Sequence, residues 1–264
     1  MELKEFLEKR KSCRNYEDRE LSSSTLLKVR QILDKVNEKA KTYNVEFKLY
    51  GNSIFEALDG IGGYSGVMIK SPNYISMNYK SKEKETLIYG AYYLEEIVGE
   101  LAKLDLGSCW ITLFSMDKDI KSKTFGTNDD IDFILAFGYP AGKPAFELDV
   151  YSSRLGIEDF VFFNDFKTPV TVEQLYSYGL DDIFYYIKNA PSAYNKQPWR
   201  FLIKGENIYL YIEDFHGDAN LTDSGIVMYY YVKMAEISNI KATWHLDGDP
   251  EVETEFKYIG RTNF

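Results

Sequence analysis

The chain of 264 residues is 45% apolar and 16% aromatic, enough to bury one large core or two small ones. Its formal net charge of -10 and a pI near 4.9 argue against a nucleic-acid binder, because such proteins carry a basic face. No stretch approaches the ~20 apolar residues of a membrane helix, and the N-terminus lacks a signal-peptide core. We therefore expect a soluble, cytoplasmic protein without nucleic-acid or membrane partners.

Cysteine and histidine are too sparse to build a site of their own. The two cysteines, Cys13 and Cys109, cannot form a disulfide framework and lack metal-ligand spacing. The two histidines, His216 and His245, are far apart in sequence, which makes a histidine metal site or a catalytic triad a poor hypothesis. We expect no metal, and chemistry that is carried by a bound group.

The first half of the chain shows helical and strand-like apolar spacing in alternation. The second helix has a start signal at Ser22–Ser24, and Gly107 is placed to end the third as a C-cap. In chain order the predicted elements are a helix over 3–11, a helix over 26–40, a strand over 45–50, a strand over 67–69, a helix over 86–104 and a strand over 131–137.

The second half repeats this alternation. A helix is predicted from Val172, strands over 200–204 and 208–212 around the turn 205–207, a helix from Asp223 and a last strand over 256–259. The N-cap of the later helix is assigned to Thr222 or Asp223. The run Tyr229–Tyr231 within that helix indicates packing rather than a binding platform.

Glycines cluster in the segment 59–66, which invites comparison with a phosphate-binding loop. Such a loop opens a helix, whereas an apolar, strand-like triplet, Val67–Ile69, follows here. A surface loop, or at most a lid near a site, is the better prediction.

The segment Ala190–Trp199, with the sequence APSAYNKQPW, predicts a polar loop between a helix and a strand. Pro191 and Pro198 push the residues before them out of the helical region. The short polar side chains between them can both donate and accept hydrogen bonds: Ser192, Asn195, Lys196 and Gln197. The loop can therefore surround the edge of a planar heteroaromatic ligand.

A second candidate site is the basic segment that follows the first helix. Arg10, Ser12 and Arg14 place two cations and a hydroxyl at alternate positions, which suits an anion. A solvated basic turn is the alternative interpretation.

Both segments resemble motifs of the FMN-dependent nitroreductase family, the loop its APSxxNxQPW signature and the basic segment its RxSxR/K motif. Gly107–Phe114 resembles the family's GLGTCWIGGF segment, with Thr112 and Leu113 in place of the glycines, and Gly138–Gly142 holds its GYP turn. The resemblance is to the branch in which one chain holds two half-repeats.

The resemblance implies an α+β fold, an α/β/α sandwich with a mainly antiparallel central sheet. One domain, 1–264, would contain half-repeats of about 1–158 and 159–264. Gly90 and Gly225, in matching places near the starts of two long helices, support this repeat. The chain would be a single-chain pseudo-dimer, a monomer or at most a weak homodimer.

The resemblance also implies site residues for FMN. Arg10 and Arg154 would bind the phosphate, Ser12 the phosphate or the ribityl chain, and Arg14 the N1 and O2 edge of the ring. The second half would frame the ring through Pro191, Ser192, Asn195 and Gln197. In the first half, the main chain of Thr112 and Leu113 would lie near N5 of the ring. For Arg154, which follows Tyr151–Ser153, a surface salt bridge is the alternative role.

The implied activity is that of an NAD(P)H oxidoreductase that reduces nitroaromatic or quinone-like acceptors in a ping-pong cycle. No protein nucleophile is needed, because the flavin carries the electron chemistry. The first half holds the basic segment and the second half the loop, so one FMN per chain is expected.

Two other functions are compatible with these motifs. The chain could bind flavin without turnover, as a store or sensor, since Thr112 and Leu113 replace the family's glycines. It could also be a degenerate member that binds no flavin and serves as an interaction module.

Overall fold

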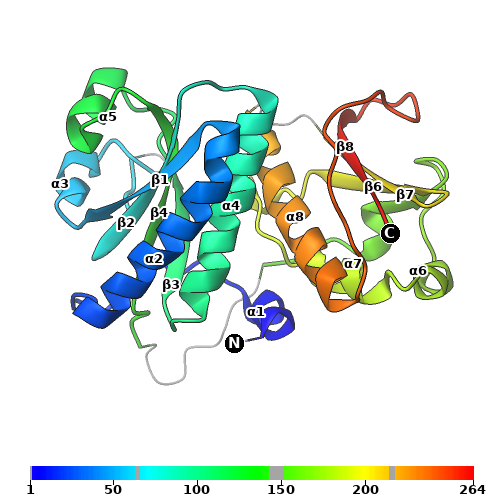
Figure 1. The fold of residues 1–264 in the computed structure, drawn as a ribbon, viewed down its shortest axis with the longest axis horizontal. Coiled ribbons are helices and arrows are strands. Elements are labelled where there is room, and N and C mark those ends of the chain that lie inside the picture. The colour runs from blue at the N-terminus through cyan, green and yellow to red at the C-terminus, as the bar shows by residue number, and fades with distance from the viewer. Residues whose placement is uncertain (1, 64–65, 143–151, 214–217) are drawn as a thin grey trace. The chain divides into compact units, whose positions relative to one another are not determined.

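The computed structural model describes residues 2–63, 66–142, 152–213 and 218–264 (Figure 1). Residues 64–65 of the glycine-containing segment 59–66, Tyr151 and His216 lie outside the described residues. None of the described helices is both long enough and apolar enough to span a bilayer.

The chain divides into two compact units, which interleave in sequence. Unit 1 comprises Met1, Lys11–Thr86 and Tyr93–Val150, and unit 2 comprises Glu2–Arg10, Leu87–Tyr92 and Tyr151–Phe264.

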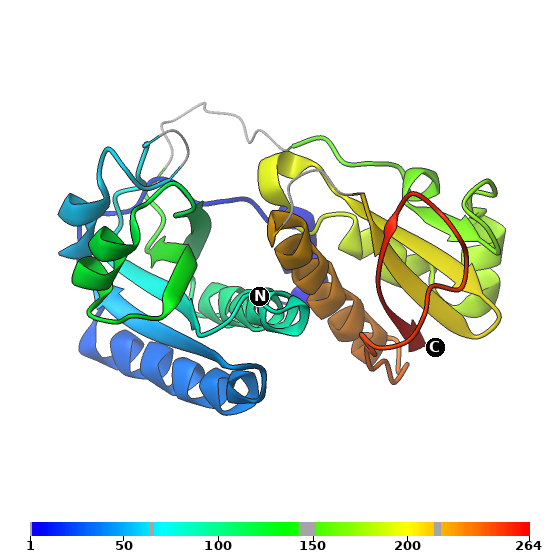
Figure 2. The same cartoon turned by 90° about the horizontal axis from the view of Figure 1, so that it is seen from above.

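Unit 1 is built around a four-stranded antiparallel sheet of order β1-β2-β4-β3. Helices α2 and α4 cover one face of this sheet, and α3 and α5 cover the other (Figures 1 and 2). The elements are α2 (Ser23–Ala40), η1 (Lys41–Tyr43), β1 (Val45–Gly51), α3 (Ile54–Leu58), β2 (Asn73–Tyr79), α4 (Lys84–Ala102), β3 (Gly107–Thr112), α5 (Lys118–Phe125) and β4 (Asp130–Gly138).

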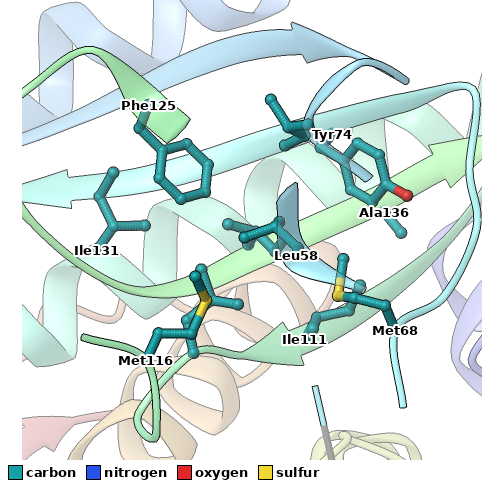
Figure 3. Packing of buried hydrophobic residues seen from close by; sticks show 11 residues of the cluster. Leu58, Met68, Tyr74, Ile111, Met116, Phe125, Ile131 and Ala136 are labelled. Atoms are coloured by element: carbon teal, nitrogen blue, oxygen red, sulfur yellow. The ribbon is translucent and has the colours of Figure 1, made fainter. Parts of the chain in front are cut away.

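Apolar side chains fill the space between this sheet and the helices α3 and α5 (Figure 3). Tyr74 and Ala136 come from the sheet, and Leu58 and Phe125 come from the two helices. Because helices lie on both faces, the central strand β2 is buried along most of its length.

The predicted start of the second helix is confirmed, since the Ser22 hydroxyl accepts the N–H of Thr25 as an N-cap. The predicted strand 67–69 is wrong, and the strand of this region is β2. The hydroxyl of Tyr74 donates to the Ile69 carbonyl and accepts the Ser71 N–H, so these groups bond a side chain rather than a neighbouring strand.

Gly107 is not the C-cap of α4, which ends at Ala102 with Lys103 as its cap. Instead, Gly107 is the first residue of β3. A Cβ placed there would lie 2.7 Å from both Cβ and Sγ of Cys13. The glycine therefore makes room for the segment that contains Cys13.

Unit 2 is built around a second four-stranded sheet, of order β5-β6-β7-β8. Only the β5 and β6 pair is parallel; the other neighbours are antiparallel. The elements are α1 (Leu3–Lys9), η2 (Ile157–Asp159), β5 (Val161–Phe163), α6 (Val172–Tyr178), α7 (Asp181–Ile187), η3 (Ala193–Asn195), β6 (Trp199–Lys204), β7 (Asn207–Ile212), α8 (Asp218–Ile237) and β8 (Lys257–Asn263).

Aromatic side chains form the core of unit 2. Phe201 of β6 packs against Phe184 of α7 at a centroid distance of 5.3 Å and against Tyr231 of α8 at 6.3 Å. On the other face of the sheet, Leu202 and Tyr211 belong to a separate cluster. The expectation that the tyrosine run of α8 packs in the core is confirmed.

The predicted hairpin is confirmed as β6 and β7. The helix predicted from Val172 is two helices, because Gly179 ends α6 in the left-handed region at φ 68°. The N-cap prediction for the last helix is wrong, since α8 begins at Asp218 and both Thr222 and Asp223 lie inside it.

Gly225 of α8 lies in close contact with the segment Leu87–Tyr92 of α4, which belongs to unit 2. A Cβ at this position would lie 1.9 Å from the carbonyl oxygen of Ile88, in the part of α4 that belongs to this unit. Glycine is therefore required by the approach of the two backbones rather than by its own torsion angles.

The two units share an order of elements. In each, an antiparallel strand pair (β1 and β2, or β6 and β7) is followed by a long helix (α4 or α8). A later strand (β4 or β8) then pairs with the second strand of that pair. The predicted α+β class with mainly antiparallel sheet is confirmed, and this order is the half-repeat pattern of a pseudo-dimer.

Candidate functional site

The segment between α7 and β6 forms the polar loop that the sequence predicts. Within it, Tyr194, Asn195 and Gln197 adopt φ values of 52°, 58° and 50°. Asparagine tolerates this left-handed region, whereas tyrosine and glutamine rarely adopt it. Such conformations persist only where surrounding contacts impose them, and they cluster at functional sites.

Hydrogen bonds inside the loop hold this conformation. The hydroxyl of Ser192 accepts the N–H of Gln197 at 2.8 Å, and the side-chain amide of Gln197 donates to the Asn195 carbonyl at 3.2 Å. The side-chain oxygen of Gln197 accepts the N–H of Leu155 at 2.9 Å. The loop is thereby connected to the segment that precedes η2.

Arg154 lies against the loop and is fixed by it. Its Nη1 donates to the carbonyl of Ala190 at 3.0 Å and to Oδ1 of Asn195 at 2.8 Å. The Asn195 amide donates to the carbonyl of Ser153 at 2.8 Å. Within the described residues only Nη1 of Arg154 makes hydrogen bonds, so Nε and Nη2 keep their N–H donors for a ligand.

A second cation lies near Arg154. Burial and the positive charge of Arg10, the residue directly after α1, lower the pKa of the Arg154 guanidinium to about 10, while Tyr230 acts in the opposite direction. Arg154 therefore remains a cation at neutral pH, and the two like charges repel each other. An anion with several oxygens would relieve this repulsion and accept the remaining donors.

Asp223 of α8 is a residue of this region that sequence reasoning misplaced. Asp223 as a whole is only 3% exposed, and both of its carboxyl oxygens accept the N–H of Ala193. Burial raises the pKa of Asp223 to about 8. The residues on either side of it, Thr222 and Ser224, are polar and typical of a helix start, so no local signal in the sequence indicated its burial.

Ser12 and Arg14 belong to unit 1, on either side of a fixed residue. The N–H of Cys13 donates to the Ser108 carbonyl at 2.9 Å, and the Tyr16 hydroxyl donates to the Cys13 carbonyl at 2.7 Å. Ser12 is half-buried and Arg14 is exposed. Among the described residues, the Arg14 side chain has no hydrogen-bond or ion-pair partner.

Thr112 and Leu113 also belong to unit 1, where the protein already uses part of their main chain. The N–H of Leu113 donates to the Asp132 carbonyl at 2.8 Å, and the Thr112 carbonyl accepts the N–H of Gly63 at 3.0 Å. The Leu113 side chain is fully buried in the core of unit 1. The role of this main chain beside a ring stays a prediction.

The predicted site residues thus fall into two groups. Those of unit 1 are Ser12, Arg14, Thr112 and Leu113, and those of unit 2 are Arg10, Arg154, Pro191, Ser192, Asn195 and Gln197. Within unit 2, hydrogen bonds connect Arg154, Asn195, Gln197 and Ser192, and the charge of Arg10 acts on Arg154. Pro191 is half-buried at the start of the loop.

Comparison with solved structures shows the fold. A putative nitroreductase from Thermotoga maritima matches with a TM-score of 0.64 and 20% identity over 99% of this chain and 92% of that chain. An FMN-dependent nitroreductase from Clostridium difficile matches with a TM-score of 0.43 and 21% identity over 55% and 91% of the two chains. An FMN-dependent nitroreductase from Mycobacterium smegmatis, in complex with NADPH, matches with a TM-score of 0.43 and 13% identity over 52% and 87%.

No curated protein matches the sequence. The model of the family described as "Putative TM nitroreductase" matches residues 2–235, which is most of the chain. Together with the fold, this match confirms the family resemblance of the two motifs, and the chain belongs to the TM nitroreductase family.

Proposed function

We propose that the protein is an FMN-dependent oxidoreductase that takes electrons from NAD(P)H and passes them to nitroaromatic or quinone-like acceptors in a ping-pong cycle. Family membership supports an oxidoreductase role. The observation that carries the cofactor assignment is Arg154, which two hydrogen bonds hold against the polar loop and which the positive charge of Arg10 influences.

The residues of unit 2 fit the phosphate of FMN. Arg154 is half-buried, remains charged and has unused donors on Nε and Nη2, while Arg10 adds a second positive charge. A planar guanidinium can bond two phosphate oxygens together. A dianionic phosphate would also reduce the repulsion between the two arginines, so its binding is electrostatically favoured.

The other predicted residues complete the proposal. Ser12 would donate to the phosphate or the ribityl chain, and Arg14 would place a cation at the N1 and O2 edge of the ring, where negative charge collects on reduction. Pro191 and Ser192 would frame the ring. When bound, FMN supplies the hydride and electron chemistry. No side chain of this protein is needed as a nucleophile.

The proposal includes one flavin for each chain, because unit 2 alone contains both the loop and the Arg10 and Arg154 pair. The test is the absorption spectrum of the purified protein, followed by quantification of the chromophore released on denaturation. We expect FMN at one molecule per chain. Two flavins per chain would contradict the single site.

Flavin binding without turnover is the second candidate function, because Leu113 fills the core and its N–H already bonds Asp132. Anaerobic addition of NAD(P)H separates the two functions. Bleaching of the flavin within seconds supports the oxidoreductase, and a persistent yellow colour supports the binder. In the Arg14→Ala variant, bleaching should slow and flavin affinity should fall, whereas Arg19→Ala, at another exposed arginine of unit 1, should change neither.

A further inference from the structure

The side chain of Asn195 is engaged at both ends by the segment 153–155. Its Oδ1 accepts from Nη1 of Arg154 at 2.8 Å, and its Nδ2 donates to the carbonyl of Ser153 at 2.8 Å. These two bonds hold the arginine and its own main chain at the same time. The orientation of the Arg154 guanidinium is therefore set by the loop.

The backbone of the loop is shaped to make these contacts. Asn195 has φ 58° and Gln197 has φ 50°. The side-chain oxygen of Gln197 accepts the N–H of Leu155, the residue that follows Arg154. Left-handed conformations cost free energy in residues other than glycine, although asparagine tolerates them better than most. The hydrogen bonds to 153–155 offset this cost, which indicates that fixing this segment is what the loop conformation achieves.

Arg154 needs such a restraint because Arg10 repels it. Without Asn195, Nη1 would keep only the carbonyl of Ala190 at 3.0 Å, and a single hydrogen bond does not fix a planar guanidinium. The side chain would then be free to rotate away from the second cation toward solvent.

We infer that Asn195 is a positioning residue that holds Arg154 for the phosphate of FMN and does not itself contact the isoalloxazine ring. This inference rests on the proposed function. It replaces the expectation from the sequence motif, in which Asn195 frames the ring, because the structure gives both ends of the amide other partners.

Comparison of FMN with riboflavin, which lacks only the phosphate, tests the inference. The full chain, freed of bound flavin, is titrated with each compound and the quenching of flavin fluorescence is followed. Asn195→Gly removes the amide while allowing the positive φ. Loss of a hydrogen bond to a charged group should weaken FMN binding about 10-fold and riboflavin binding less than about twofold.

The matched control is Tyr194→Gly. It places glycine at the neighbouring left-handed residue, which is 65% exposed, and it leaves the Arg154 contacts in place. The ratio of FMN to riboflavin affinity should stay at its wild-type value. In an Arg154→Met background, Asn195→Gly should change FMN affinity by less than about twofold, because the two residues act through one interaction.

Equal losses for FMN and riboflavin, or no loss for either, would overturn the inference. Failure of the wild-type chain to bind either flavin would instead refute the proposed function. If Asn195→Gly does not fold, as judged by circular dichroism, Asn195→Asp provides the test. Its carboxylate would neutralise Arg154, so the ratio of FMN to riboflavin affinity should fall, and an unchanged ratio would contradict the positioning role.

Discussion

The carboxyl group of Asp223 accepts the backbone N–H of Ala193 with both of its oxygens, at 3.0 and 3.2 Å. This contact joins the interior of α8 to the loop that holds Arg154. Because the carboxyl group is buried, its ionisation is opposed, and the pKa of Asp223 is raised to about 8. The loop is therefore linked to a group whose charge depends on pH.

Replacing Asp223 by Asn should flatten the pH dependence of stability. Between the ordinary aspartate pKa of about 4 and the folded value, the folded state binds a proton that the unfolded chain has released, so wild-type stability falls as pH rises. The effect reaches about 1.4 kcal/mol per pH unit at most. Urea denaturation at several pH values between about 5 and 8 measures it, and parallel profiles for wild type and Asp223→Asn would contradict the prediction.

Gly225→Ala should destabilise the protein, although alanine normally favours a helix. The new Cβ would meet the Ile88 carbonyl oxygen at 1.9 Å, and a backbone atom of a packed helix cannot easily move. We expect a loss of about 2 kcal/mol or more in the free energy of unfolding. Gly179→Ala is the comparison, since no atom lies within 4 Å of its Cβ position and only its φ of 68° opposes the substitution, at a cost of about 1 kcal/mol. A stabilised Gly225→Ala variant would refute the close contact.

The stability of the protein with the buried carboxylate of Asp132 in unit 1 should depend on Lys121 more than on Lys82. Burial opposes its ionisation, but hydrogen bonds from Lys82, Tyr79 and Lys121 outweigh burial and lower the pKa of Asp132. The Lys121 side chain is 10% exposed and that of Lys82 41%. Lys121→Met should therefore cost about 3 kcal/mol and Lys82→Met less than about 1 kcal/mol in urea denaturation at neutral pH.

The destabilisation by Lys121→Met should also depend on pH, because Asp132 is titratable. Asp132 contributes stability above its unfolded pKa, and this contribution is lost as pH falls through the lower folded value. The difference between wild type and Lys121→Met should therefore shrink in acid. Equal destabilisation by the two lysine variants would contradict the dominant role of Lys121.

Local signals predicted much of the fold. The Ser22 cap and the apolar run of β6 depend on residues close in sequence, and the structure confirms both. The prediction of a strand over Val67–Ile69 was wrong because a short apolar run is compatible with a strand or with a loop. In the structure, the Ile69 carbonyl accepts the Tyr74 hydroxyl.

For the candidate site, the sequence suggests residues but not the contacts between them. The resemblance to the family suggests Arg154 and Asn195 as candidate residues, yet nothing in the sequence shows that they bond each other, because 41 positions separate them. The burial of Asp223 likewise follows from how α8 packs, which a helix-start pattern does not reveal. Tertiary contacts supplied what the local pattern lacked.

Leu113→Ala should separate the stability of unit 1 from flavin binding. The leucine is fully buried and belongs to the core cluster, so truncation should lower the free energy of unfolding by about 2 to 5 kcal/mol. The role proposed for this residue near a ring involves its main chain, which the substitution keeps. The affinity of the folded protein for FMN should therefore remain at its wild-type value, measured by titration well below the unfolding temperature. Thr112→Ala, at the half-buried neighbouring position, should cost less than about 1 kcal/mol. A fall in FMN affinity in Leu113→Ala beyond the fraction of unfolded protein would show that the leucine side chain itself shapes the flavin site.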